Sequence, residues 1–410
     1  MIMISVNEAR ERLVAQFQPV GQSIVSLEQA LDRVLAEPVV SPFDFPLFDN
    51  SSMDGFAVIA RDVQAASSGQ PVILQVIGDI PAGAPPASLH LGPEKTMRIM
   101  TGAPLPPGAD AVVPVESTDQ LRGADIPLPS SIAVLQPVKA GENVRPHGQD
   151  FHAGQIVLSA GRLLRPEDIG LLAMLGLPQV AVINQPRVAL LSSGDELLPA
   201  AHSLAPGKIH DANTPMLTAL LEKAGVEVIP LGIARDDSKD IEERLNRGVA
   251  SGVNLIITSA GASVGSLDYA RSVIQAHGEI DFWQVAMRPG KPVAFGHYQG
   301  IPILTLPGNP VSAFVGFQVF VRPVLARLQG LPQLNRLTVS AVLDEPVESD
   351  GRESYLRASL SEIDGIYHAR LTGHQGSGNL LSVVQANALL IVPSEVKSLP
   401  AGVKLKAWML

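Results

Sequence analysis

The segment LIITSAGASVGSLDY, residues 255–269, decides the fold, because a turn rich in glycine and serine directly follows an apolar run. The apolar run predicts a buried β-strand, and open α/β sheets bind ligands where such strands end. Gly261 and Gly265 would let the backbone approach a ligand closely. Ser263 and Asp268 offer a hydroxyl and a carboxylate. The loop is therefore a candidate phosphate or oxyanion cradle with a metal ligand beside it, although turns of this composition are more often plain connections.

Strand and helix patterns alternate on both sides of this segment, from Arg187 to Gln329. Apolar runs typical of buried strands, such as VALL and IPILTL, are separated by helical patterns such as SKDIEERLNRGVA. A helix between two strands is the crossover that joins parallel neighbours. This region therefore predicts an α/β domain with a mostly parallel sheet, which is the candidate for the catalytic domain.

The rest of the chain is richer in short strands. Strand patterns separated by Gly/Pro turns at 71–116 predict a small β-rich domain, and those at 338–409 predict a small β-barrel or sandwich. Two helices are expected near the N-terminus, because Ser5 and Ser26 each stand three residues before a Glu or Gln, as in a capping box. We expect the apolar faces of these helices to pack on another element, for which a partner subunit is one candidate.

Composition excludes several classes of function. The 410 residues correspond to two to four domains, and 40 acidic against 30 basic residues give a net charge of −10. The absence of cysteine excludes disulfides, thiolate metal sites, iron–sulfur clusters and cysteine nucleophiles. We see no basic cluster, no signal-peptide pattern and no uncharged apolar run of roughly 18 residues. We therefore expect a cytoplasmic protein that acts on a small molecule, with neither nucleic acid nor a membrane as its partner.

The predicted strand ends of the α/β domain carry polar groups of a consistent kind. Carboxylates follow the strands at Glu196, Asp236 and Asp268. The turns around them are formed by small residues and prolines, which include Ser193, Gly194, Pro307 and Pro310. Oxygen ligands suit Mg²⁺, and a divalent ion that bridges phosphates is the usual reason for such a mixture. For each acidic group alone, the competing interpretation is the capping of a helix N-terminus, which we favour for Asp237.

A second acidic stretch, PFDFPLFDNSSMDG at 42–55, lies far from these strands in the sequence. Its prolines predict a loop, and its last carboxylate is Asp54. A solvated linker in which Asp and Asn side chains cap turns is an equally good interpretation. Thr101 follows a strand within another Gly-rich turn, and NVRPHGQD adds Arg145 and Asp150. These residues form a second candidate region for ligand binding.

Positive charge comes from MRPGKP at 287–292, where Arg288 and Lys291 flank a Pro-Gly turn. Such groups neutralise the charge of a phosphate or an oxyanion. The motifs GxxxxGK[ST] and GxGxxG are absent from the sequence. The common nucleotide-triphosphatase and dinucleotide-binding interpretations therefore lack their key residues.

Seven separated motifs, in order along nearly the whole chain, closely resemble those of the MoeA family of molybdopterin molybdenumtransferases. They are FDNSSMDGFA (48–57), RIMTGAPLPPGADAVV (98–113), ALLSSGDEL (189–197), the SAGASVG loop with its aspartate (259–268), RPGKP (288–292), LPGNPVS (306–312) and TGHQGS (372–377). Seven motifs in the correct order are far more specific than any single Gly-rich loop.

The resemblance implies a multidomain α/β and β fold. Its parts would be a central MogA-like α/β domain with a mostly parallel sheet, a β-rich second domain, a C-terminal small β-barrel, and a helical and extended N-terminal linking domain. The implied boundaries are 1–42 with 144–178 for the linking and dimerisation domain, 43–143 for the β-rich domain, 179–331 for the molybdopterin-binding domain, and 332–410 for the barrel.

The resemblance also implies the activity. An enzyme of this family takes adenylyl-molybdopterin and molybdate and yields molybdenum cofactor and AMP with Mg²⁺. It implies a homodimer whose cleft joins the α/β domain of one subunit to the β-rich domain of the other, and contact with a MogA-like adenylyltransferase and other proteins of cofactor biosynthesis.

The candidate site residues divide into three groups. The expected catalytic residues are Asp54, Glu196, Asp268 and Lys291, of which Glu196 and Asp268 are also the expected metal ligands. The expected substrate-binding residues are Thr101, Arg145, Asp150, Ser193, Gly194, Asp236, Gly261, Ser263, Gly265, Arg288, Pro307, Pro310 and Ser377.

Two alternatives stay open at this point. The chain could be a non-catalytic molybdopterin-binding or scaffold protein, or a relative that uses tungstate, which is a tetrahedral dianion of nearly the same size as molybdate. An enzyme is favoured by the presence of Asp54, Glu196, Asp268 and Lys291, since a scaffold can lose such residues without losing its fold. The chain departs from the family pattern at Ala260, where glycine is common, and at Gln284, where lysine is frequent.

Overall fold

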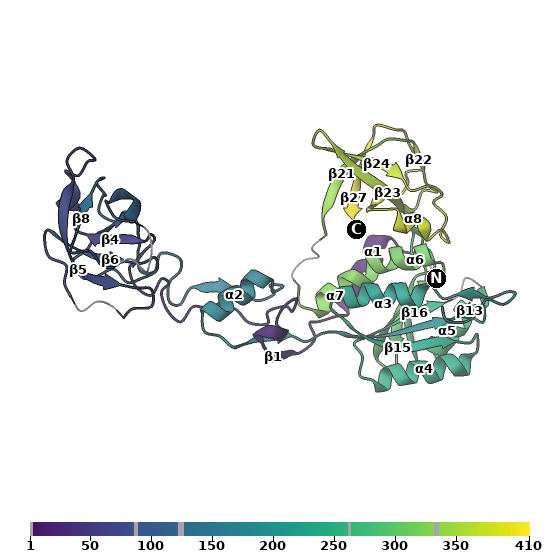
Figure 1. Cartoon of the computed structure of the whole chain (residues 1–410). Coiled ribbons are helices and arrows are strands. Elements are labelled where there is room, and N and C mark those ends of the chain that lie inside the picture. The colour runs from purple at the N-terminus through teal and green to yellow at the C-terminus, as the bar shows by residue number, and fades with distance from the viewer. Residues whose placement is uncertain (1–2, 86–88, 122–126, 261–263, 332–335) are drawn as a thin grey trace. The chain divides into compact units, whose positions relative to one another are not determined.

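The structure is a computed structural model that describes residues 3–85, 89–121, 127–260, 264–331 and 336–410, with the backbone only for 260 and 264–268. The chain forms two compact units (Figure 1). The first unit comprises Met1–Glu37 and Ala160–Leu410, and the second comprises Pro38–Ser159.

A six-stranded sheet forms the centre of the first unit, in the order β15-β12-β16-β20-β19-β17. The first four strands are parallel, and β19 and β17 are antiparallel to their neighbours. The sheet is therefore mostly parallel, as the alternating sequence pattern predicts. The strands are β12 (Arg187–Ser193), β15 (Glu227–Ala234), β16 (Leu255–Ala260), β17 (Gly278–Phe282), β19 (Ala294–Tyr298) and β20 (Ile301–Pro307).

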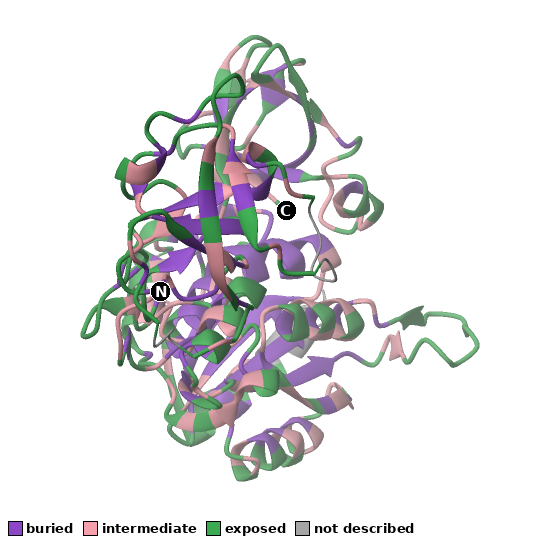
Figure 2. Ribbon diagram, turned by 60° about the vertical axis from the view of Figure 1, so that its left-hand side comes forward, coloured by how far each residue is buried: buried purple, intermediate pink, exposed green. Residues whose placement is uncertain are grey.

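Helices cover both faces of this sheet. The helices are α3 (Asn213–Lys223), α4 (Ser238–Ala250), α5 (Val264–His277), α6 (Pro310–Gly316), a π-helical turn (Phe317–Val321) and α7 (Arg322–Leu328). Val188 and Leu190 of β12 pack with α3, α6 and α7, whereas Ala189 and Leu191 pack with α4 and α5. Successive side chains of a strand point to opposite faces, so a strand covered on both sides must be apolar throughout. Figure 2 shows the resulting band of buried residues along the strands.

The segment Pro310–Leu328 is long and apolar enough to cross a membrane by length and composition. In the structure, 83% of its apolar window is buried inside the protein. Burial of this extent is the pattern of a core helix, and the helix packs on β20 and on the N-terminal helix α1 (Val6–Ala15).

The C-terminal strands close into a barrel. They pair in the order β23-β24-β21-β27-β25, and β25 pairs back to β23. The strands are β21 (Thr338–Leu343), β23 (Glu353–Ile363), β24 (Ile366–Leu371), β25 (Ala388–Val392) and β27 (Lys404–Met409), with α8 (Leu381–Val384) and the short pair β22 (Val347–Glu348) and β26 (Ser398–Leu399) beside them. A barrel, and not an open sandwich, is therefore the outcome. β18 (Met287–Arg288) joins it to the α/β domain by pairing with β23.

The second unit is β-rich, as predicted. Its five-stranded sheet has the order β7-β4-β6-β5-β8, with β4 (Gly55–Val58), β5 (Val72–Ile80), β6 (Lys95–Ile99), β7 (Ala111–Pro114) and β8 (Ser131–Val134). Two short antiparallel pairs complete the unit, β2 (Val39–Val40) with β10 (Ile156–Leu158) and β3 (Asn50–Ser51) with β9 (Val144–Arg145).

Only the first of the two expected N-terminal helices forms. The Ser5 hydroxyl accepts a hydrogen bond from the Glu8 N–H at 3.2 Å and caps α1, whose buried face packs in the core of the α/β domain. The prediction of a second helix at Ser26 is wrong. β1 (Gln22–Ser26) pairs with β11 (Gln179–Ile183), and a single 3₁₀ turn follows. Tertiary pairing thus overrides a local pattern. The other helix beside this pair, α2 (Pro166–Met174), begins with a proline in its first turn, where the missing N–H costs no hydrogen bond.

Gly55, the first residue of β4, offers a test of the packing of the second unit. A Cβ added to Gly55 would lie 2.1 Å from the Val113 carbonyl oxygen, so Gly55→Ala must push β7 away. We expect destabilisation of about 1–3 kcal/mol, as for overpacked sites, and faster hydrogen exchange in β4 and β7. Gly69→Ala is the matched control, because no atom lies within 4 Å of its added Cβ. Equal exchange rates in the two variants would contradict the steric argument.

Candidate active site

Four parallel strands end in one row at the carboxyl edge of the α/β sheet. The backbone register aligns Ala234 of β15 with Ser193 of β12, Ser193 with Ala260 of β16, and Ala260 with Pro307 of β20. Ligands of open α/β sheets bind at this edge. The register therefore brings together the loops that carry most of the residues predicted from the α/β domain.

The loop after β12 folds back on itself at Gly194. A Cβ added to Gly194 would lie 2.7 Å from Glu196 Oε2, so a larger residue would displace this carboxylate from its present position. The Gly194 N–H donates to the Ala234 carbonyl at 3.1 Å, which ties the β12 loop to the end of β15. Ser193 is buried at the strand end, and Glu196 is half-buried. Ser193, Gly194 and Glu196 thus lie at the predicted edge.

Asp195, Glu196 and Asp236 concentrate negative charge there. The Asp236 N–H donates to Asp195 Oδ1 at 3.3 Å, and Asp236 Oδ1 is buried without a hydrogen-bond partner. Burial raises the pKa of the Asp236 carboxyl, and the charges of Asp195 and Glu196 raise it further. The site therefore holds a carboxylate whose charge is poorly compensated by the protein. Asp237, in contrast, caps α4 by accepting from the Asp240 N–H at 3.1 Å, which confirms its structural interpretation.

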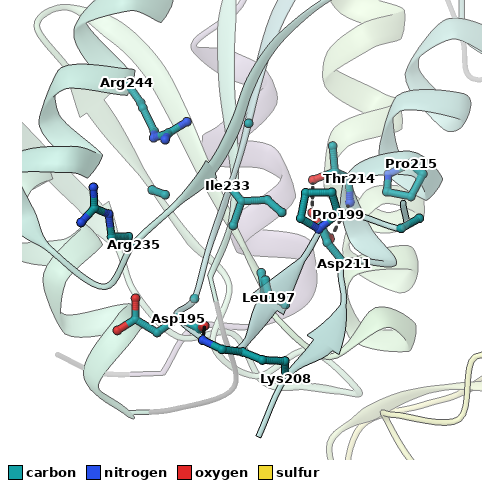
Figure 3. A pocket seen from close by; sticks show the side chains of 14 residues that line it. Asp195, Leu197, Pro199, Lys208, Asp211, Thr214, Pro215, Ile233, Arg235 and Arg244 are labelled. Carbon is teal, nitrogen blue, oxygen red and sulfur yellow. Dashed lines mark hydrogen bonds between the residues drawn. The ribbon is translucent and has the colours of Figure 1, made fainter. Parts of the chain in front are cut away.

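A cavity of about 800 Å³ opens beside this loop (Figure 3). Its wall includes residues of the segment that connects the parallel pair β13 (Leu197–Leu198) and β14 (Ile209–His210), the end of β15 and the start of α3. Lys208, Arg235 and Arg244 give it cationic groups, and Asp195 and Asp211 give it carboxylates. Lys208 Nζ donates to the Asp195 carbonyl at 2.5 Å. A cavity with this charge pattern suits a ligand that has both apolar and phosphate parts.

The start of α3 adds polar residues that the sequence analysis did not single out. Asp211 accepts hydrogen bonds from the backbone of Asn213 at 2.9 Å and Thr214 at 3.1 Å. The Asn213 side-chain amide donates to Ser259 Oγ and to the Gly308 carbonyl, both at 2.7 Å. Asn213 therefore connects the end of β16 to the loop after β20. The signal in the sequence was the run Asp-Ala-Asn-Thr-Pro, in which a capping aspartate precedes a proline in the first helical turn.

The cradle expected after β16 differs from the prediction. α5 begins at Val264, so Gly265 and Asp268 lie in the first turns of a helix and not in the expected loop. Their side-chain surroundings, like the residues Gly261 and Ser263 themselves, lie outside the described part of the structure. A helix that starts there directs backbone N–H groups at the strand edge, which retains the chemistry of an anion site. The roles of these four residues stay predictions.

The barrel contacts the loop between β20 and α6. Pro307 ends β20, and Pro310 occupies the first turn of α6. Ser377, from the barrel, accepts a hydrogen bond from Asn309 Nδ2 at 3.0 Å, and its carbonyl accepts one from the Val311 N–H at 3.1 Å. The predicted residues Pro307, Pro310 and Ser377 are therefore neighbours, and Ser377 holds the barrel against this loop.

Cationic groups gather at the same junction. Arg288 lies in β18, next to the barrel, and Lys291 is exposed in the turn that follows. The fully buried Arg357 donates to Ser382 Oγ at 3.0 Å and to the Gly376 carbonyl at 3.1 Å. Burial and the charge of Arg288 lower the pKa of Arg357 to about 10, and no carboxylate among the described residues pairs with it. Arg357 was missed because its sequence context gives no sign of burial.

The predicted residues of the second unit form two separate pairs. Asp54 Oδ1 accepts from the Thr101 N–H at 2.9 Å and from the Thr101 hydroxyl at 2.7 Å. Arg145 and Asp150 form an exposed ion pair at 2.7 Å. Thr101 thus orients the Asp54 carboxylate. The structure also leaves the metal site a prediction, since the described residues contain no group of three His, Cys, Asp or Glu side chains placed to hold a metal ion.

The fold and these groups define a multidomain protein in which a ligand-binding α/β domain is joined to a β-rich domain and a barrel. Three family models match the chain: the MoeA N-terminal region (domain I and II) over residues 4–176, a probable molybdopterin binding domain over 189–327, and the MoeA C-terminal region (domain IV) over 340–410. The chain belongs to the MoeA family, whose curated members at this similarity are named molybdopterin molybdenumtransferases. It is therefore a transferase of molybdenum cofactor biosynthesis.

Similarity to individual relatives extends over the full length. The chain is 40% identical to molybdopterin molybdenumtransferase 2 of Mycobacterium tuberculosis, with 99% of each chain covered. It is 35% identical to the molybdopterin molybdenumtransferase of Haemophilus influenzae, with 98% and 97% covered. A crystal structure of the molybdopterin biosynthesis moeA protein of Pyrococcus horikoshii OT3 matches with a TM-score of 0.83, 29% identity and full coverage of both chains. These matches confirm the predicted family and fold class.

The raised pKa of the Asp236 carboxyl predicts that the stability of the protein depends on pH. Because its pKa is raised, the folded state binds this proton more tightly than the unfolded chain, and the free energy of unfolding falls as pH rises between the ordinary and the raised pKa. Above that interval, Asp236→Asn should unfold at a higher temperature than the wild type, and the difference should vanish at lower pH. Asp195→Asn should raise the unfolding temperature by part of the same amount. Thermal unfolding at several pH values checks this, and a difference independent of pH would refute it.

Proposed function

We propose that this protein inserts molybdenum from molybdate into adenylyl-molybdopterin and releases AMP, in a reaction that depends on Mg²⁺. The observation that carries the proposal is the match over 99% of the chain to a relative named for molybdenum transfer to molybdopterin. The chemistry of the residues at the sheet edge also supports the proposal. The substrate combines a pterin, a phosphoanhydride and a nucleoside, and the α/β domain combines an apolar cavity with cations and carboxylates at one sheet edge.

In this proposal the pterin nucleotide binds at the carboxyl edge of the sheet. Ser193, Gly194 and the N-terminal end of α5, which carries Gly265, would supply hydroxyl and N–H donors to its phosphates. Lys208 and Arg235 border the cavity and would offset phosphate charge. Asp236 directly follows Arg235 in the chain, and Glu196 lies in the loop that begins at Gly194, so carboxylates accompany these cations at the sheet edge. Cleavage of the phosphoanhydride would then take place between a cationic group and a carboxylate group.

Molybdate would bind at the junction of the α/β domain and the barrel. Arg288, Lys291 and Arg357 contribute positive charge there, and Ser377 contributes a hydroxyl. A buried guanidinium without a carboxylate partner is costly unless an anion compensates it. A dianion such as molybdate meets that requirement, and tungstate meets it equally well.

The carboxylates at the sheet edge fit Mg²⁺ by their chemistry. Asp195, Glu196 and Asp236 offer oxygen atoms, and the orphaned Asp236 Oδ1 shows that their charge lacks compensation. Mg²⁺ usually keeps several waters and needs only one or two carboxylates besides substrate phosphates, so no ready-made cage is required. Glu196 and Asp268 would hold it in this proposal. When bound, the ion would neutralise charge that develops on the phosphoanhydride during cleavage.

Residues of the second unit complete the proposal. Asp54, oriented by Thr101, would act as a further carboxylate, and Arg145 with Asp150 would bind substrate. We propose that the protein acts as a homodimer and receives its substrate from a MogA-like adenylyltransferase. The division into four domains at 1–42 with 144–178, 43–143, 179–331 and 332–410 belongs to the same proposal.

Release of AMP from adenylyl-molybdopterin tests the proposal directly. The purified protein should release AMP only when molybdate and Mg²⁺ are both present, and EDTA should abolish release until Mg²⁺ is added back. Chromatographic quantitation of AMP gives the rate. Tight binding of the pterin nucleotide without release would instead show a binding protein, and undiminished release in EDTA would remove the metal from the reaction.

Asp268→Asn tests the most specific catalytic assignment. The substitution keeps the size of the side chain but removes its charge, so we expect turnover to fall at least about tenfold, or about 1.4 kcal/mol of barrier, with folding unchanged. Asp237→Asn is the control, because asparagine caps α4 as well as aspartate does. Both variants are compared by steady-state AMP release and by thermal unfolding. Equal turnover in Asp268→Asn and the wild type would exclude a catalytic role.

A further inference from the structure

Arg336 connects the core helix of the α/β domain to the barrel. It lies between α7 and β21, just after the part of the linker that lies outside the description. Its guanidinium carbon stands 4.0 Å from the centre of the Trp408 ring, on β27 of the barrel. Arg336 Nη2 also donates to the Gln318 carbonyl at 2.7 Å and to Gln318 Oε1 at 3.0 Å. One side chain therefore contacts both domains, with its guanidinium over an indole ring and one of its nitrogens bonded to both Gln318 oxygens.

A proline in the sequence leaves the Gln318 carbonyl without its helical hydrogen-bond donor. Gln318 lies in the π-helical turn, where a carbonyl accepts from the N–H five residues later. For Gln318 that residue is Pro323, which has no N–H to donate. The N–H of Arg322 is already directed to the Phe317 carbonyl. The Gln318 carbonyl is thus available inside an otherwise satisfied buried helix, and Arg336 supplies the donor.

The surroundings of Arg336 make this contact specific. Burial lowers the pKa of Arg336 to about 10, with a further lowering by the charges of Arg322 and Arg10. No carboxylate among the described residues forms an ion pair with its guanidinium, so the Trp408 ring face is its main electrostatic partner on the barrel side. The Trp408 ring packs at 5.2 Å on Tyr355 of β23. β23 is the strand that also carries Arg357 and pairs with Arg288.

We propose that Arg336 is a positioning residue for the molybdate site: it fixes the barrel on the core helix so that Arg357 and Ser377 keep their places beside Arg288. The inference rests on the proposed function, because it takes that junction to be the oxyanion site. The path runs from Gln318 through Arg336 and Trp408 to Tyr355 and the strand of Arg357. The hydrogen bond from Asn309 to Ser377 is a second contact between the α/β domain and the barrel.

The chain contains a matched control for the Arg–Trp contact. Arg271 of α5 stands over the Trp283 ring at 5.1 Å, and both residues belong to the α/β domain. Arg271→Lys removes a guanidinium–indole contact of the same chemical type without touching the barrel. It separates the effect of losing such a contact from the effect of releasing the barrel.

The test compares Arg336→Lys, Trp408→Leu, their double variant and Arg271→Lys in the full-length protein. Lysine keeps the charge of Arg336 but cannot stack on the ring and bond both Gln318 oxygens. We expect Arg336→Lys to raise the KM for molybdate about tenfold, with the KM for adenylyl-molybdopterin unchanged. Trp408→Leu should do the same, and the double variant should be no worse than either, because both break one connection. Arg271→Lys should match the wild type.

Hydrogen exchange supplies a readout that does not need activity. Amides of β27 and β21 should exchange faster in Arg336→Lys than in the wild type, with no change in β12 or β16. An unchanged KM for molybdate, or an equal loss of kcat with both KM values constant, would overturn the positioning role. If the wild type itself released no AMP, the proposed function would fail. Hydrogen exchange would then test only whether Arg336 holds the barrel on the core helix. Faster exchange in the barrel of Arg336→Lys would support this role, and unchanged exchange would overturn it.

Discussion

The parallel register of β15, β12, β16 and β20 is the constraint on which the rest of the structure depends. Each strand is apolar because helices cover both of its faces, and the pairing aligns Ala234, Ser193, Ala260 and Pro307 in one row. A shift of one residue in any pair would turn its apolar side chains to the wrong layer. The buried hydrogen bond between Thr258 and Thr305, at 2.9 Å, further favours this register across β16 and β20. The loops of the site therefore converge as a consequence of core packing.

This edge collects charge that the fold itself does not need. Asp237 and Asp240 are engaged in capping and in hydrogen bonds with Arg235 and Arg244, and they behave as ordinary helix-start carboxylates. Asp236, between the same elements, has a buried oxygen with no partner and a raised pKa. A protein that retains such a cost at the edge where ligands bind is using it for something other than stability. The contrast between Asp236 and its neighbours Asp237 and Asp240 supports a ligand-binding site more strongly than the number of carboxylates does.

Most of the fold follows from the sequence because its signals are local and repeated. Alternating strand and helix patterns predict the α/β sheet, and short strands predict the β-rich unit and the barrel. Ser26 misleads because its capping pattern is local, while the pairing of β1 with β11 connects residues more than 150 positions apart in sequence. The same limit applies to the site. Glu196 and Asp236 follow from strand ends, whereas the burial of Arg357 is set by a barrel that closes around it.

Pro323 illustrates how a local defect acquires a long-range partner. Within a helix, proline removes a donor and leaves a carbonyl unsatisfied, which in a buried segment costs free energy. Here the π-helical turn moves the unsatisfied carbonyl to Gln318, on the side of the helix that Arg336 reaches. The arginine is held in turn by Trp408 of the barrel. The position of the last domain thus depends on a hydrogen bond that the core helix cannot make for itself, and a residue far from the sheet edge acquires a part in the geometry of the site.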